Sequence, residues 1–332
     1  MADLFDAVFG NFEAKALFSQ CINDNKLSHA YMLVGPEGCG KKTFVKAIAQ
    51  NLARRDGSDE ETISRISTGH SPDVLSIPTE DKKIGIDAVR SFVSTVYLTP
   101  NELDFKMYIF DKADKMTPQA QNALLKIIEE PPKRVYIFLL CENPASLLQT
   151  VRSRVIAVNM QTFSEAQVRE YIERSAPELA LSASEERSAF ALKMSRGALG
   201  AVKNLLDPEN GEFEAYTKAH EIIAALSRKN RGVSYFDFIS IIFLFADNSE
   251  KLALLLKYLA LFYRDVLAAQ NSEYAEILTL TEDDAIKFAS VFPISSTLDV
   301  LDVITEVSAN MAFNSNLSLA CAYLAENLWH RT

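Results

Sequence analysis

The stretch YMLVGPEGCGKKT, Tyr31–Thr43, decides the fold. Its first four residues are apolar and predict a buried strand, and the run Phe44–Leu52 that follows predicts a helix. A glycine-rich turn between a strand and a helix is typical of a phosphate-binding loop, because glycines let backbone N–H groups wrap a phosphate and the helix N-terminus adds a positive pole. The residues of the predicted nucleotide site in this stretch are Gly35, Gly38, Gly40, Lys41 and Thr43.

The loop departs from the usual pattern in one position. The residue after the loop lysine, Lys41, is normally Ser or Thr, whose hydroxyl binds Mg²⁺, and here it is Lys42. Thr43 comes one residue late, so we expect its side chain to point elsewhere on the helix. A cation in the metal position opposes Mg²⁺ binding, and we therefore expect Lys42 to disable nucleotide chemistry.

A second element of the predicted site follows the apolar run Met107–Phe110. Asp111 ends that predicted strand, where a carboxylate can hold Mg²⁺ directly or through water. Hydrolysing proteins of this architecture place a glutamate next, to activate the attacking water, and this chain has Lys112. Lysine cannot act as a carboxylate base, so the sequence lacks the catalytic base, whether Lys112 has a role or is an ordinary surface lysine.

The composition is that of a folded protein with an acidic C-terminal half. The 332 residues carry 34 Lys and Arg against 44 Asp and Glu, a formal charge of -10. Residues 1–160 hold 19 basic and 20 acidic side chains, so almost all of the negative charge falls on residues 161–332. This distribution disfavours a protein that binds nucleic acid alone by neutralising phosphates.

Several further features favour a cytoplasmic protein. The first 15 residues contain Asp3, Asp6 and Glu13, which a signal peptide would not have, and we expect no membrane span. The four cysteines are scattered without the paired spacing of a zinc site, so we expect reduced thiols and no metal.

Apolar runs and helical patterns alternate along residues 1–160, which predicts a parallel sheet covered by helices. The predicted strands are 31–34, 107–110 and 135–140. Between the last two we expect a helix with Thr117 as its N-cap and Pro118 at its first position, ended by Pro131-Pro132.

Helices dominate the rest of the chain. Ser164 and Gln167 predict a capping box, and Gly197 predicts the end of a helix that begins near Ser184. The apolar helix 252–270 fits either a core or an interface. We expect three domains: an α/β domain over 1–160, a small helical domain over 161–208 and an all-helical domain over 209–332.

Longer strings resemble a known family. KMYIFDKADKMTPQAQNALLKIIEEPP and VYIFLLCENPASLLQTVRSRV resemble the clamp-loader subunits of the bacterial replicative DNA polymerase, within the AAA+ superfamily. NKLSHAYMLVGPEGCGKKT and HSPDVLSIPTEDKKIGIDAVRSF are similar to the member of that family that does not hydrolyse ATP. The likeness is strong over about residues 1–205, and a weaker likeness of the tail rests on YLALFYRDVLAAQ and NSNLSLACAYLAENL. It implies an AAA+ α/β domain, a helical lid domain and a helical collar domain.

The resemblance implies a partner set and one residue that acts on a neighbour. Such subunits form a hetero-oligomeric ring that loads a sliding clamp on primer-template DNA, and basic residues such as Lys82, Lys83 and Arg90 are candidates to face that DNA. The family's Ser-Arg-Cys motif sends an arginine to the ATP of the next subunit. Ser153 and Arg154 match its first two positions, and an ordinary salt-bridged arginine is the alternative.

The same resemblance sharpens the losses in the nucleotide site. Gly200 stands where motor subunits carry a lid arginine, and Cys141 and Glu142 stand where a neutral Thr or Asn would orient water. Many relatives carry a cysteine-rich zinc module before the segment that contains His70, and this chain has no cysteine there, so no zinc is expected.

Three functions fit the sequence to different degrees. The first is a non-hydrolysing clamp-loader subunit in DNA replication, with no intrinsic ATPase and no required cofactor. The second is an ATP-hydrolysing clamp-loader motor subunit. The third, suggested by the loop alone, is a P-loop small-molecule kinase. Weak binding of ATP or phosphate without Mg²⁺ stays open in each case.

Overall fold

The computed structural model describes residues 5, 8–77, 84–175, 177–178, 183–229, 232–272, 276–311 and 316–332. Lys82 and Lys83 lie outside these residues. The chain divides into two compact units, the first made of residues 1–177 and 195–202 and the second of 178–194 and 203–332.

The first unit is an α/β sandwich around a parallel sheet of five strands in the order β2-β3-β4-β1-β5. Parallel strands with helical crossovers are what the alternating pattern of residues 1–160 predicts, and the three predicted strands are confirmed as β1, β3 and β4. The strands are β1 (Ala30–Val34), β2 (Val74–Ile77), β3 (Lys106–Phe110), β4 (Val135–Cys141) and β5 (Ile156–Asn159).

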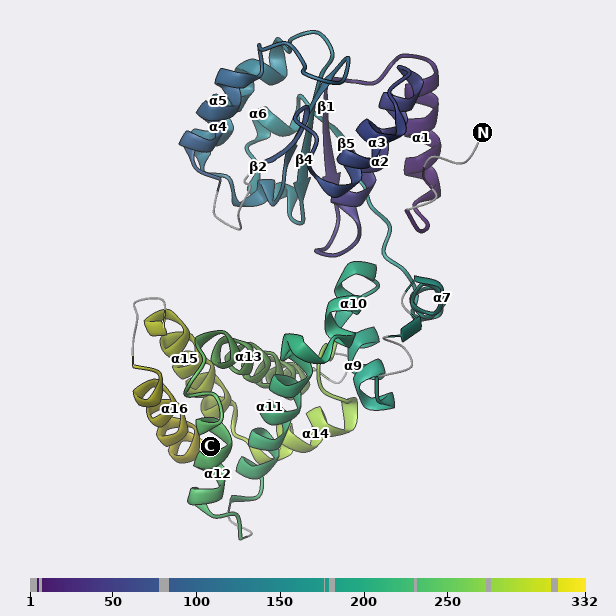
Figure 1. The fold of residues 1–332 in the computed structure, drawn as a ribbon. Coiled ribbons are helices and arrows are strands. Elements are labelled where there is room, and N and C mark those ends of the chain that lie inside the picture. The colour runs from purple at the N-terminus through teal and green to yellow at the C-terminus, as the bar shows by residue number, and fades with distance from the viewer. Residues whose placement is uncertain are drawn as a thin grey trace. The chain divides into compact units, whose positions relative to one another are not determined.

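Helices cover both faces of this sheet, with α1–α3 on one face and α4–α6 on the other (Figure 1). Alternate residues of each central strand enter the two cores: Leu33 and Phe138 pack on the α1–α3 side, Met32 and Leu139 on the α4–α6 side. The helices of this unit are α1 (Phe12–Asn23), α2 (Lys41–Arg55), α3 (Glu60–Thr68), α4 (Ile86–Thr95), α5 (Pro118–Glu129), α6 (Gln149–Arg152) and α7 (Glu165–Ser175), with short 3₁₀ turns η1 (Ala113–Lys115) and η2 (Pro144–Ser146).

The predicted helix boundaries in this unit hold because local capping fixes them. The Thr117 side chain accepts a hydrogen bond from the Ala120 N–H at the start of α5, and Pro118 occupies its first position. The capping box is also present: Ser164 and Gln167 bond each other's backbone N–H groups, at 3.4 and 3.0 Å.

The buried carboxylate of Asp73 fixes the entry to strand β3. It accepts hydrogen bonds from the backbone N–H groups of Asn101, Glu102 and Leu103 at 2.7–3.0 Å, although these residues lie about 30 positions further along the chain. The side chain is fully buried. A carboxylate that replaces water for three backbone donors makes this turn part of the core.

The second unit consists of helices in the described residues. The apolar helix predicted over 252–270 is α13, and its buried residues, which include Leu255, Leu259 and Phe262, pack against α11, α14 and α15. It is therefore a core helix of this unit. The elements are α9 (Glu185–Ser195), η3 (Pro208–Asn210), α11 (Glu212–Leu226), α12 (Tyr235–Phe243), α13 (Ser249–Asn271), α14 (Glu282–Val291), α15 (Ile294–Met311) and α16 (Leu317–Arg331).

Helix α10 (Leu199–Leu206) starts in the first unit and continues into the second. Gly197, in a left-handed conformation with φ of 77°, separates it from α9. In the part of the chain that the structure describes, no single helix is long and apolar enough to cross a membrane, and only the bent pair α14 and α15 passes that test when its two helices are added together.

Candidate functional site

The predicted phosphate loop joins β1 to α2 at the carboxyl edge of the sheet. Since β1 lies between β4 and β5, the loop emerges at the point where the strand order reverses, which is where open parallel sheets bind ligands. The carboxyl ends of β3 and β4 reach the same edge, so Asp111, Lys112, Cys141 and Glu142 meet the loop there.

These residues line one pocket of about 270 Å³, slightly smaller than the roughly 300–1,000 Å³ typical of small-molecule sites. The pocket gathers the predicted residues Gly38, Gly40, Lys41, Lys42, Thr43, Asp111 and Lys112. It is also lined by Glu37, Asp114, Leu140, Cys141, Glu142 and Gly200.

Among the residues that the structure describes, the lining carries no excess of positive charge. Its formal charges are three lysines against four carboxylates. A triphosphate placed in the pocket would therefore meet more acidic than basic side chains, unlike the usual phosphate cradle of basic side chains and free N–H groups.

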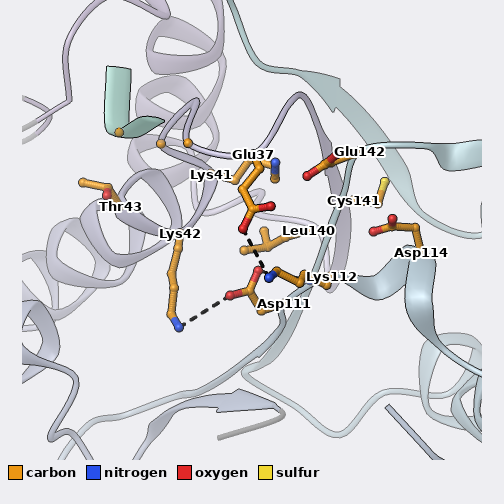
Figure 2. A pocket seen from close by; sticks show the side chains of 13 residues that line it. Glu37, Lys41, Lys42, Thr43, Asp111, Lys112, Asp114, Leu140, Cys141 and Glu142 are labelled. Carbon is orange, nitrogen blue, oxygen red and sulfur yellow. Dashed lines mark hydrogen bonds and ion pairs between the residues drawn. The ribbon is translucent and has the colours of Figure 1, made fainter. Parts of the chain in front are cut away.

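Lys42 and Asp111 form an ion pair across the metal position. The Nζ of Lys42 lies 3.6 Å from Oδ2 of Asp111 (Figure 2). The carboxylate that would bind Mg²⁺ thus faces an ammonium group. Mg²⁺ prefers oxygen ligands in near-octahedral geometry, and a neighbouring cation opposes it. The residues present do not fit a magnesium ion.

Lys112 makes a second ion pair in the same pocket, with Glu37 of the loop. Their charged atoms are 3.2 Å apart, and Figure 2 shows the two side chains extending toward each other. Lys112 has a left-handed backbone, with φ of 53°, which is uncommon for a residue other than glycine. The position of the catalytic base is therefore occupied by a lysine paired within the chain.

Lys41 is turned back on its own loop. Its Nζ donates hydrogen bonds to the carbonyl oxygens of Gly35 and Pro36, at 2.6 and 2.8 Å. Gly35 thus belongs to the site through its carbonyl group. In Figure 2 Thr43 lies apart from Lys42 and Asp111, as expected from its position one residue late.

The start of α10 packs directly on the phosphate loop. The N–H of Gly200 donates a hydrogen bond of 2.7 Å to the carbonyl oxygen of Gly38. A Cβ added to Gly38 would lie 2.6 Å from the nitrogen of Ala201, and one added to Gly200 would lie 3.0 Å from the Gly38 oxygen. A side chain on either glycine would obstruct the close contact between Gly200 and Gly38, which we call the lid contact.

Cys141 and Glu142 occupy the position where a water-orienting group is expected. Burial, with a further contribution from Asp114, raises the pKa of the Cys141 thiol to about 11, so the thiol is neutral near pH 7. Burial also raises the pKa of Cys39 in the loop. A neutral thiol is a weak hydrogen-bond donor and acceptor.

Arg154 and Ser153 lie outside the pocket. They follow α6, and the Arg154 side chain is 41% exposed. Its Nε lies 2.7 Å from a carboxylate oxygen of Glu129, and its Nη1 donates to the Thr150 carbonyl and to Oγ of Ser153. Arg90, a candidate to face DNA, makes an exposed ion pair with Asp87.

Sequence reasoning missed three features of the site. It did not pair Glu37 with Lys112, did not include Asp114, and did not foresee that Gly200 would touch Gly38. An acidic residue between two loop glycines is a signal that could have suggested the first pairing. The other two depend on contacts between distant parts of the chain.

Comparisons with known proteins agree with one another. A family model described as "DNA polymerase III, delta subunit" matches residues 10–164. The chain is 30% identical over 185 residues to the DNA polymerase III subunit delta' of Pseudomonas aeruginosa, covering 53% of this chain and 56% of that protein. It is 26% identical over 260 residues to the delta' subunit of Bacillus subtilis, covering 76% of each.

Other relatives match over less of their length. The DNA polymerase III subunit gamma/tau of Mycobacterium bovis is 30% identical over 158 residues, 45% of this chain, and the chain spans about a quarter of that relative, 27%. Among solved structures, a DNA polymerase III gamma subunit-related protein from Thermotoga maritima aligns with a TM-score of 0.50 at 21% identity, covering 95% of this chain and 99% of that one. This structural likeness supports the fold.

Proposed function

Because the chain belongs to the clamp-loader family of DNA polymerase III subunits, we propose that it is a delta-prime-type subunit that does not hydrolyse ATP itself. It takes part in DNA replication as a member of a hetero-oligomeric ring in the cytoplasm. Its AAA+ domain, 1–160, carries the degenerate nucleotide site, residues 161–208 form the lid, and residues 209–332 form the collar that joins the ring.

The ion pair between Lys42 and Asp111 carries this proposal. It fills the position of the metal with an ammonium group and occupies the carboxylate that would bind Mg²⁺. Phosphoryl transfer in proteins of this architecture depends on that metal to neutralise the developing charge. A carboxylate base is a second requirement for hydrolysis, and Lys112 stands in its position.

The lid contact supports the same conclusion. In a motor subunit the lid responds to nucleotide, which requires groups that touch the nucleotide. Here Gly200 has no side chain to offer, and its N–H already bonds the phosphate loop. We infer that the lid of this subunit is held by the loop itself and does not report on bound nucleotide.

The proposed positive role is carried by Arg154. Its guanidinium is exposed on the outside of the AAA+ domain, away from the residues that line the chain's own pocket. An arginine supplied by a neighbouring chain can stabilise the negative charge that develops on the transferred phosphoryl group, an effect of about 10³ to 10⁵ in rate in related NTPases. We propose that Arg154 acts in this way on the ATP of an adjacent subunit.

The partners follow from the proposed ring. They are the other clamp-loader subunits, the sliding clamp, and primer-template DNA bound through the whole assembly. Gamma/tau subunits are also among the relatives of this chain, so an ATP-hydrolysing motor subunit is the competing function. None of the described residues that line the pocket favours a small-molecule kinase.

ATP turnover by the purified chain separates the two. We expect a rate no greater than that of a Lys41→Ala variant, measured with Mg²⁺ and saturating ATP. Turnover well above that of the variant would overturn the non-hydrolysing role. Binding of ATP with and without Mg²⁺ tests the open question of whether the loop holds phosphate at all.

A further inference from the structure

The contacts of Arg154 come from two different elements. Thr150 and Ser153 belong to the local turn that carries the arginine, and Glu129 is the last residue of α5. The carboxylate oxygen of Glu129 lies 2.7 Å from Nε. Nη1 donates to the Thr150 carbonyl at 3.0 Å and to the Ser153 hydroxyl at 3.3 Å.

These contacts determine how the planar guanidinium is oriented. A guanidinium has five N–H donors in a fixed plane: one on Nε and two on each terminal nitrogen. Glu129 binds the Nε side and the turn binds Nη1. Among the residues that the structure describes, none accepts a hydrogen bond from Nη2 of Arg154. The plane is held at two positions while Nη2 keeps its donors for another molecule.

The ion pair between Arg154 and Glu129 contributes little to the folding stability of the subunit. The side chains of Arg154 and Glu129 are 41% and 47% exposed. Exposed pairs of this kind contribute little to stability, and they restrict the rotamers of a long side chain. The net effect on folding is small, so the pair has little structural value to the isolated subunit.

Orientation matters more for an arginine that stabilises a transition state. Groups that act on developing charge are effective when they are held in place before the reaction, and a misplacement of about 1 Å can cost on the order of 10²-fold in rate. A free arginine on a surface turn would sample many rotamers. Glu129 reduces that freedom and accepts no hydrogen bond from Nη2.

We propose that Glu129 is a positioning residue that orients the guanidinium of Arg154 for the nucleotide bound by the adjacent subunit. This inference rests on the proposed function, since it requires Arg154 to act on a neighbouring ATP. It adds a residue of α5 to the parts of this chain that control hydrolysis elsewhere in the ring.

The chain offers a matched control one residue away. Glu130 follows Glu129, is exposed, and makes no ion pair among the described residues. Glu129 ends α5 and Glu130 is its C-cap, and both can be replaced by alanine, a strong helix former. The test uses loaders reconstituted with wild-type, Glu129→Ala, Glu130→Ala, Arg154→Ala and Glu129→Ala/Arg154→Ala chains.

The measurement is the steady-state rate of ATP hydrolysis by each loader over a range of ATP concentrations up to saturation, with sliding clamp and primer-template DNA present. We expect Glu129→Ala to slow the affected site about 10-fold, with the KM for ATP unchanged, and Glu130→Ala to leave the rate unchanged. In the Arg154→Ala background, Glu129→Ala should add nothing, because it acts only through the arginine.

Each other outcome has a distinct meaning. If Arg154→Ala does not slow hydrolysis, the trans-acting role in the proposed function fails. If Arg154→Ala slows hydrolysis and Glu129→Ala does not, the positioning role is overturned while the proposed function stands. Equal slowing by Glu129→Ala and Glu130→Ala, or an additive effect of Glu129→Ala on Arg154→Ala, would show a general disturbance of α5 and would also overturn it.

Discussion

Lys42 holds Asp111 at 3.6 Å, Nζ to Oδ2, in the position where a phosphate-binding loop normally assembles a magnesium site. The pair joins the first turn of α2 to the end of β3, and so links the two sequence elements that define a nucleotide site. This ion pair neutralises two charges within the chain, and it puts an ammonium group where Mg²⁺ would bind.

Replacing Lys42 with threonine should make nucleotide binding depend on Mg²⁺. The change removes the ammonium group, frees Asp111 and supplies the missing hydroxyl. Two like unit charges about 4 Å apart repel by about 4 kcal/mol at an effective dielectric constant of ~20, so removing the lysine removes a large penalty against the metal. We expect Mg²⁺ to raise the ATP affinity of Lys42→Thr at least several-fold and to leave that of the wild type unchanged, measured by equilibrium binding.

Lys46, one turn further along α2, provides the control for that experiment. Its Nζ bonds the Ser67 carbonyl, outside the pocket. Lys46→Thr changes the net charge equally and should gain no Mg²⁺ dependence. A gain in both variants would show that net charge, and not the metal position, limits binding.

The lid contact predicts different costs for two glycines of the same loop. Both Gly38 and Gly40 have positive φ, at 79° and 91°, but a Cβ on Gly38 would lie 2.6 Å from the Ala201 nitrogen, whereas one on Gly40 would meet nothing within 4 Å. Gly40→Ala should cost about 1 kcal/mol from backbone strain, and Gly38→Ala about 2 to 4 kcal/mol. Urea denaturation, with hydrogen exchange at the Gly200 amide, measures both. Equal costs and an unchanged Gly200 amide would contradict the lid contact.

Asp73 should be among the costliest polar residues to remove. Asp73→Ala leaves the N–H groups of Asn101, Glu102 and Leu103 without their acceptor, and each unsatisfied buried donor costs about 1 to 3 kcal/mol. We expect a loss of about 3 to 5 kcal/mol in urea denaturation and faster exchange of these three amides. Asp87→Ala, an exposed carboxylate, should change stability by only about 0.5 kcal/mol. A similar, small loss in both would show that the turn does not depend on Asp73.

The thiols should react in an order set by burial. Burial raises the pKa of Cys141 to about 11 and also raises that of Cys39, so both are protonated thiols at pH 8 and poor nucleophiles. Cys21 is partly exposed. Iodoacetamide at pH 8, followed by mass spectrometry, should modify Cys21 first. Modification of Cys39 or Cys141 at the same rate would show that the pocket opens readily in solution.

Much of the first unit could be predicted from local sequence. Thr117 and Pro118 fix the start of α5, and the glycine loop between an apolar run and a helix fixes β1 and α2, because capping and turn chemistry act over a few residues. The sequence did not identify β2 and β5. Both are edge strands of four residues with one buried position each, so their apolar pattern is too short to stand out.

The sequence predicted the individual residues of the site better than the contacts between them. Lys42, Asp111 and Lys112 could be selected because the motif gives each position a role. Their contacts could not be predicted, because they join distant parts of the chain. Lys112 meets Glu37 across about 75 residues once the sheet has formed, and Gly200 meets Gly38 across about 160 residues once α10 packs on the loop. The apolar helix α13 could not be assigned to core or interface until its neighbours were known.

One measurement tests the central claim most directly: ATP hydrolysis by the reconstituted loader, stimulated by clamp and primer-template DNA, with either Lys41→Ala or Arg154→Ala in this subunit. If the subunit is non-hydrolysing and acts on its neighbour, Lys41→Ala will leave the rate unchanged and Arg154→Ala will abolish the share contributed by the adjacent site. A loss of activity with Lys41→Ala, together with no effect of Arg154→Ala, would show that the subunit is itself a motor.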